Sequence, residues 1–345
     1  MRFPIALLPT LITGLVAGPV LAEPPAVVAD IAPVHALLSQ VMDGVATPQL
    51  LLEQNADPHA VQLRPSQARM LAGADLLVWV GPELSPWLEG IVGTEGTEDL
   101  VLTALPETHL RTFGGEDADH GDDAGHDDHG GADEADHEHE DDGDHDHAGA
   151  TGADETQADE TQAEEAGHDH AHTGVDPHVW LSTGNARAWL GVFAETLAAR
   201  DPENAAAYRA NAQDAVAELD ALDARIAARL AAHQGAEIVT FHAAFGYFTE
   251  AFGIEVVGSV RPGDASAPSA AALDALRDLV AEHGVECAFA EPAYDPGLLD
   301  TIAGGTGLRI GTLDATGSTQ VPGPGQYAAT LEGIAVAIAE CLEAG

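Results

Sequence analysis

Short apolar runs alternate with stretches of helical periodicity in the first part of the chain. Ala26–Ile31 and Asp75–Val80 are short and apolar, as buried strands are. Pro33–Met42 carries apolar residues at steps of three and four, which predicts a helix with proline in its first turn. A third apolar run at Leu50–Leu52 and a short helix ending near Leu71 lie between them. This alternation predicts parallel βαβ units.

The same alternation resumes in the last third of the chain. The expected strands are Glu237–Phe241, Ile254–Val260, Val285–Ala290 and Leu308–Leu313. The expected helices are Ala243–Phe252, Pro268–Glu282, Pro296–Ala303 and Tyr327–Leu342. A second α/β lobe with a parallel sheet is therefore expected there.

Between these two parts the pattern becomes purely helical. Ser182 can cap a helix to about Arg200, and Asp201-Pro202-Glu203 is a second helix-start signal. Neither Gly nor Pro follows until His233 is passed, so one amphipathic helix of about 30 residues, roughly 45 Å long, is expected. Its apolar positions are Tyr208, Ala212, Ala215, Leu219, Leu222, Ile226 and Leu230. A helical bundle or coiled coil is the alternative, but the resumed alternation favours a strut between two lobes.

Residues 115–172 have a composition of their own. They hold ten histidines and 23 acidic residues, without Lys, Arg or aromatic residues, so little apolar surface can offset the entropy of folding. We expect a disordered, metal-binding loop, since interleaved imidazoles and carboxylates attract divalent metals. A solvated acidic loop is the alternative. The histidines are His120, His126, His129, His137, His139, His145, His147, His168, His170 and His172.

The formal net charge of −46 bears on the partners of the chain. Outside the loop the chain still has 35 acidic residues and only 12 Lys and Arg. This excess argues against nucleic acid and anionic membranes as partners and suits a cation.

An export signal is predicted at the N-terminus from Arg2, the apolar stretch Ile5–Val20 and the small residues before Ala22, with cleavage after Ala22. A membrane anchor is the alternative, but the stretch is short for a bilayer span and holds Pro and Gly.

Export also bears on the two cysteines, Cys287 and Cys341. In an oxidising compartment an isolated pair predicts a disulfide, worth about 4 kcal/mol in the chain-entropy model. Two buried free thiols are the alternative, and the sequence alone does not decide between them.

Three further histidines are candidate metal ligands. His242 follows a predicted strand, where open α/β sheets bind ligands, and His59 and His178 follow Pro residues that hold the backbone extended. Three imidazoles converging in a cleft would form a zinc site with one position open. An isolated histidine is more often a surface or hydrogen-bonded residue, as we expect for the three comparison histidines His35, His233 and His283.

Several segments resemble one family. They are Leu63–Ser66, Ala74–Glu83, Asp176–Ser182, Phe241–Phe248, Phe289–Pro292 and Gly311–Asp314, and together they span nearly all of the chain that follows the signal. The chain resembles the periplasmic zinc-binding proteins of bacterial ABC uptake transporters, the ZnuA-type members of the metal-binding solute-binding proteins. The His- and acid-rich loop before His178 is itself a mark of that zinc branch.

The resemblance implies two α/β lobes joined by one long helix, with metal in the cleft between them. It implies His59, His178 and His242 as ligands and a Cys287–Cys341 disulfide. Some relatives carry an acidic ligand directly before the first histidine, where this chain has Pro58. The fourth ligand is then water, a loop histidine or the tentative candidate Asp314, with Glu291 as a weaker one.

The leading hypothesis is a monomeric periplasmic protein that captures Zn²⁺ and delivers it to an ABC permease and its ATPase. It would not be an enzyme and would not insert into the membrane. The alternatives are a zinc buffer without a transporter and a zinc hydrolase using Glu291 or Asp314 as base. Zinc affinity should fall as pH drops through about 6.5, where imidazoles gain protons. The expected parts are a signal peptide (1–22), an N-terminal lobe (23–114 and 173–200), the loop (115–172), a linking helix (201–233) and a C-terminal lobe (234–345).

Overall fold

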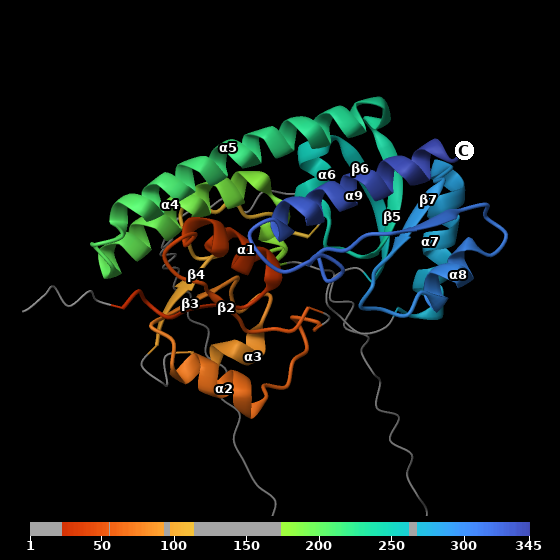
Figure 1. Cartoon of the computed structure of the whole chain (residues 1–345). Coiled ribbons are helices and arrows are strands. Elements are labelled where there is room, and N and C mark those ends of the chain that lie inside the picture. Colours follow the sequence, from red (N-terminus) through yellow and green to blue (C-terminus); the bar gives the residue numbers. More distant parts are fainter. Residues whose placement is uncertain (1–22, 55, 93–96, 114–173, 262–267) are drawn as a thin grey trace, which may run out of the picture. The chain divides into compact units, whose positions relative to one another are not determined.

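Two parallel four-stranded sheets form the framework of the chain (Figure 1). The computed structural model describes residues 23–54, 56–92, 97–113, 174–261 and 268–345. The first sheet has the order β2-β1-β3-β4, and its strands are β1 Val27–Ala29, β2 Gln49–Leu50, β3 Leu76–Trp79 and β4 Glu98–Val101. The second has the order β6-β5-β7-β8, and its strands are β5 Ala236–His242, β6 Ile254–Arg261, β7 Cys287–Ala290 and β8 Arg309–Thr312. The predicted α/β class with two parallel sheets is confirmed.

Alternate residues of the first sheet enter two different cores, because successive side chains of a strand point to opposite faces. Val27 and Val78 pack with α1 (Ala32–Val41), whereas Val28 and Leu77 pack with α2 (Pro65–Ala72) and α3 (Pro86–Glu89). Helix α3 and the edge strand β4 were not predicted from the sequence. The first sheet and its helices make up the N-terminal lobe.

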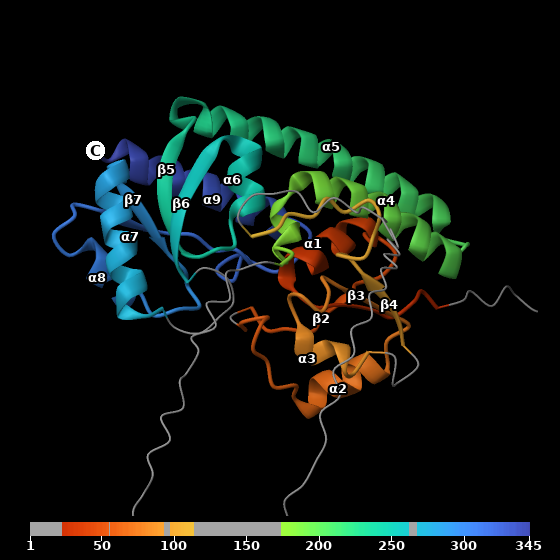
Figure 2. The ribbon, with the colours of Figure 1, turned by 180° about the vertical axis from the view of Figure 1, so that it is seen from behind.

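The second sheet is also covered on both faces, and with its helices it makes up the C-terminal lobe. Cys287 and Phe289 face α6 (Gly246–Phe252) and α9 (Gln326–Glu343). Val239 and Ala288 face the opposite way, against α7 (Ala270–His283) and α8 (Gly297–Ala303), which lie on the near side in Figure 2. All four helices begin and end within two residues of their expected positions, apart from the start of α6, which comes three residues later than expected.

One long helix packs against elements of both lobes. Helix α5 (Ala205–Leu230) contacts α4 (Thr183–Arg200) and α1 along one half of its length and α9 and α6 along the other half (Figure 1). Its buried residues are the seven apolar residues of the predicted stripe: Tyr208, Ala212, Ala215, Leu219, Leu222, Ile226 and Leu230. They join one continuous core that includes residues of both sheets. The long helix therefore ties the lobes into one packed unit.

The start of α5 differs from the prediction. It begins at Ala205, three residues after Pro202, and a 3₁₀ turn (Ala231–His233) follows it. Asp201 closes the preceding helix through its amide, which donates to Leu197 O. Its carboxylate accepts bonds from Asn204 Nδ2 and from the Tyr208 hydroxyl, so it holds the corner between two helices.

A disulfide joins Cys287 of β7 to Cys341 of α9. This confirms the predicted pairing and fastens the last helix to the C-terminal sheet. Among the described residues, none of the helices is long and apolar enough to cross a membrane. The predicted signal peptide and the His- and acid-rich loop lie outside the described residues.

Candidate metal centre

His59 stands in a loop held by its backbone. Asp57 Oδ1 accepts a bond from the His59 amide at 3.0 Å. The carbonyl of Pro58 accepts bonds from Trp87 Nε1 at 2.8 Å and from Ser85 Oγ at 3.2 Å. Because Ser85 and Trp87 belong to the start of α3, this unanticipated helix fixes where the His59 loop lies.

His178 occupies a second Asp-Pro-His triplet, after which the chain enters a 3₁₀ turn (Val179–Leu181). Asp176 Oδ1 accepts bonds from the His178 amide at 3.0 Å and from ring Nδ1 at 2.8 Å. With Nδ1 donating, Nε2 carries the lone pair and points away from Asp176. The segment is also tied to the C-terminal lobe, because Trp180 Nε1 donates to Ala315 O at 2.7 Å.

His242 is the last residue of β5, whereas the predicted strand ended one residue earlier, at Phe241. The Ala243 amide still donates to Arg261 O on the neighbouring strand, so the ladder continues and α6 begins only at Gly246. Ring Nδ1 of His242 lies 2.5 Å from Glu291 Oε1, which also accepts from the His242 amide at 3.2 Å. Glu291 directly follows β7, the strand beside β5.

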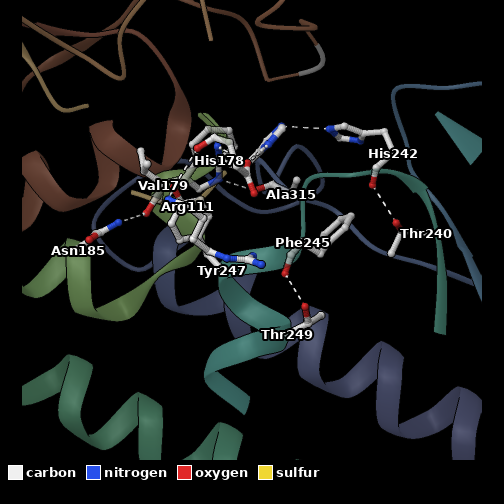
Figure 3. A network of polar contacts seen from close by, with 12 residues as sticks. Arg111, His178, Val179, Asn185, Thr240, His242, Phe245, Tyr247, Thr249 and Ala315 are labelled. Carbon is white, nitrogen blue, oxygen red and sulfur yellow. Dashed lines mark hydrogen bonds and ion pairs between the residues drawn. The ribbon is translucent and has the colours of Figure 1, made fainter. Parts of the chain in front are cut away.

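The three histidines converge on one point. Nε2 of His178 lies 3.1 Å from Nε2 of His242, and the two rings face each other in Figure 3. The ring centre of His59 lies 5.5 Å from that of His178 and 6.3 Å from that of His242. One ligand atom from each ring falls within 4.8 Å of the others. The structure thus brings together the three side chains that the sequence predicts to lie close to one another.

The spacing can be compared with that of a tetrahedral zinc site. Bonds of 2.0–2.1 Å place two nitrogen ligands about 3.3 Å apart. The His178–His242 separation of 3.1 Å is close to that value. Since all ligand atoms lie within 4.8 Å, His59 needs an adjustment of at most roughly 1.5 Å. The nitrogens of His178 and His242 thus already have nearly the spacing of a tetrahedral zinc site, and a small movement would bring His59 to the same spacing.

Burial keeps the rings of His59 and His178 neutral. Burial, with a smaller contribution from the neighbouring His178, lowers the pKa of His59 to about 3. Burial and the neighbouring His242 hold the pKa of His178 well below its usual range. Burial also raises the pKa of Asp176 to about 7, against the hydrogen bond from the His178 amide. A metal therefore meets neutral imidazoles at His59 and His178 at ordinary pH, as coordination requires.

Asp314 lies on the wall of the same cavity but is engaged elsewhere. The cavity of about 30 Å³ has room for an ion and a water molecule, and its walls include the three histidines, Glu291 and Asp314. The carboxylate of Asp314 accepts four bonds, from the amides and hydroxyls of Ser318 and Thr319. It does not join the group of three converging ligands. Its ligation stays a prediction.

The comparison histidines have structural contacts, as expected. His35 bonds to the Pro48 carbonyl at 3.1 Å, and His283 lies 3.0 Å from Glu237 Oε1. His233 lies 3.7 Å from Glu343 Oε1. The ten loop histidines lie outside the described residues. Asp176, which was not among the predicted ligands, and Glu291, a weaker candidate for the fourth ligand, contact the rings of His178 and His242. Asp176 could have been noticed in the repeated Asp-Pro-His triplet.

Comparisons with known proteins agree with this geometry. The family model described as "Zinc-uptake complex component A periplasmic" (ZnuA) matches residues 27–341. The high-affinity zinc uptake system protein ZnuA of Paracoccus denitrificans (strain Pd 1222) is 47% identical over 334 residues, which cover 96% of each chain. A match of this extent and identity shows a family relationship and not merely a shared fold.

Solved structures have the same fold. A crystal structure of ZnuA is 20% identical with a TM-score of 0.68, covering 92% of this chain and 99% of that one. SBP FpvC of Pseudomonas aeruginosa in complex with Mn²⁺ is 20% identical with a TM-score of 0.70, covering 94% and 100%. Because the family model spans the chain from its first described strand to its last helix and the Paracoccus relative covers it almost entirely, the chain belongs to the ZnuA family of periplasmic zinc-uptake components.

Proposed function

We propose that this protein captures Zn²⁺ in the periplasm with His59, His178 and His242 and delivers it to an ABC permease driven by an ATPase. The observation that carries the proposal is the convergence of three ring nitrogens, each from a different part of the chain, within 4.8 Å. The names of the relatives support it, since the Paracoccus protein is a high-affinity zinc uptake protein. The role is binding and transfer, so the chain is not an enzyme.

Zinc is the cargo that the donor set favours. Imidazole nitrogens suit zinc, whereas manganese prefers carboxylate and carbonyl oxygens. FpvC is in complex with Mn²⁺, so the shared fold does not by itself select the metal. The choice of zinc here rests on three nitrogen donors, two of which already have nearly the spacing of a tetrahedral site.

The fourth position goes to water in this proposal, and Asp314 is the alternative protein ligand. Asp314 would have to give up some of its four hydrogen bonds with Ser318 and Thr319 to reach the metal. Water needs no such rearrangement and fits the space beside the ion. An exchangeable fourth ligand also suits a protein that must release its cargo.

The loop of residues 115–172 would hold additional, weaker zinc ions and raise the supply of metal near the cleft. The N-terminal segment would be removed after Ala22 on export, leaving a monomer in the periplasm that meets the permease without inserting into the membrane. Deleting the loop should lower zinc stoichiometry and spare one tight site. Loss of the tight site would mean that the loop supplies a required ligand.

The ligand set is tested by metal analysis and competition binding on His59→Ala, His178→Ala and His242→Ala, each in the loop-deleted protein. Each variant should lose the tight site while keeping its fold. His35→Ala is the matched control, because His35 is a half-buried histidine bonded to a backbone carbonyl. Tight binding that survives in any of the three variants would remove that residue from the ligand set.

A passive zinc buffer would share this site but not the transporter. The two functions separate in a pull-down of the zinc-loaded protein with the permease and ATPase reconstituted in membranes. Retention on those membranes supports delivery to a transporter. Zinc binding without any retention would favour the buffer.

A further inference from the structure

Two buried carboxylates stand beside the proposed ligands without a place in the ligand set. Asp176 is 3% exposed and Glu291 is 6% exposed. A buried carboxylate is unfavourable unless it is hydrogen-bonded or paired with positive charge. Each of these two accepts bonds from the amide and from the ring of one histidine. Their common contact with the site calls for an explanation beyond packing.

The contacts decide which nitrogen of each ring faces the cavity. In both histidines Nδ1 points at a carboxylate oxygen, at 2.8 Å in His178 and at 2.5 Å in His242. An ionised carboxylate can only accept, so with both acids ionised Nδ1 carries the hydrogen and Nε2 carries the lone pair. Those two Nε2 atoms are the pair that lies 3.1 Å apart (Figure 3). Two lone pairs turned toward each other at that distance favour a cation between them.

The two carboxylates reach the site by independent routes. Asp176 stands two residues before His178 in the same segment. Glu291 is 49 residues away from His242 and meets it because β7 lies beside β5. In each case the hydrogen bond from the histidine amide fixes the carboxylate relative to the backbone of the histidine that it orients. The orientation of the ring is therefore set before any metal arrives.

The negative charge of these two carboxylates also favours a bound cation. Three neutral imidazoles leave the full charge of Zn²⁺ uncompensated in a buried site. Two carboxylates that contact the far nitrogens of two ligands can supply the missing negative charge without occupying a coordination position. Such carboxylate–histidine–metal arrangements orient ligands and make them stronger donors.

We propose that Asp176 and Glu291 are positioning residues of the zinc site, which fix the Nε2-facing state of His178 and His242 and compensate the charge of the bound ion. This inference rests on the proposed function, because it assigns how the same site reaches its affinity. The fourth coordination position then needs no anionic side chain, and the site can keep water there.

The experiment uses the full chain with Asp176→Asn, Glu291→Gln and Glu291→Asp, and a chelator that holds free zinc too low to fill weak sites. Asp176→Asn and Glu291→Gln should each weaken zinc binding by about 10–100-fold. Glu291→Asp keeps the charge and should recover part of the loss. Glu83→Gln is the control, because Glu83 accepts a bond from Thr103 and does not line the cavity; its affinity should match the parent.

A spectroscopic measurement separates positioning from general stability. One equivalent of Co²⁺ reports ligand geometry through its visible absorption, which should change in Asp176→Asn and Glu291→Gln and not in Glu83→Gln. Thermal unfolding of the metal-free variants checks that each one folds. Parent-like affinity and an unchanged Co²⁺ spectrum in folded Asp176→Asn and Glu291→Gln would overturn the inference. Failure of the parent protein to bind zinc tightly would instead overturn the proposed function.

Discussion

The pH dependence of zinc binding offers a quantitative test of the buried site. An imidazole of ordinary pKa, about 6.5, is about 91% neutral at pH 7.5 and about 9% neutral at pH 5.5. Each such ligand lowers the apparent zinc affinity about tenfold over that interval, because only the neutral ring binds metal. Three ordinary ligands would together lower the affinity about a thousandfold.

The structure predicts a much smaller change. Burial lowers the pKa of His59 to about 3 and holds the pKa of His178 well below its usual range. A lowered histidine pKa means that the neutral ring persists to lower pH, so neither ring is protonated appreciably at about pH 5.5. Their combined share of the loss, about a hundredfold for ordinary rings, should vanish.

Competition with a zinc chelator, corrected for the protonation of the chelator, measures this ratio between about pH 7.5 and about pH 5.5. The full chain is used at free zinc concentrations that leave the weak loop sites empty. The sequence alone predicts a fall in zinc affinity centred near about pH 6.5. The lowered histidine pKa values move this fall to lower pH, because desolvation disfavours the imidazolium. A fall approaching a thousandfold would refute the reasoning, since it would require rings that titrate as in water.

Three further predictions concern stability and are checked by denaturant unfolding of the metal-free protein. Leu222→Ala should cost about 2–5 kcal/mol, because Leu222 is fully buried in the stripe of α5 between the lobes. Replacing Cys287 and Cys341 by serine should cost about 4 kcal/mol, given the 54 residues that the disulfide spans. Burial raises the pKa of Asp30 to about 7, so its stabilising contribution is present below about pH 4 and is lost as pH rises toward about 7. Asp30→Asn should flatten the stability profile over that interval, and a profile identical to the parent would contradict it.

Much of the fold could be predicted because apolar periodicity follows burial. The stripe from Tyr208 to Leu230 predicted every buried position of α5, since one face of a long helix must pack. The edge strand β4 escaped because Glu98 and Asp99 are exposed, so it lacks the apolar run of a central strand. The short α3 has too few residues to show a period.

The candidate site was predictable in part for a different reason. His242 could be placed at a strand end from local pattern, and the resemblance to the family suggested that His59 and His178 meet it there. The contact of Glu291 with His242 depends on the strand order β5-β7, which periodicity along the chain does not specify. Long-range pairings of this kind are decided by packing, and the sequence pattern records only that each strand is buried.

The same contacts bear on whether such a site would catalyse hydrolysis. A zinc hydrolase needs an open position and a general base aimed at the metal-bound water. Asp314 is held by the amides and hydroxyls of Ser318 and Thr319, and the Oε1 of Glu291 is held by His242. Both carboxylates that could serve as base are therefore committed to other hydrogen bonds. A water at the fourth position would be exchangeable and would have no base directed at it. Such a site suits capture and release of zinc better than catalytic turnover.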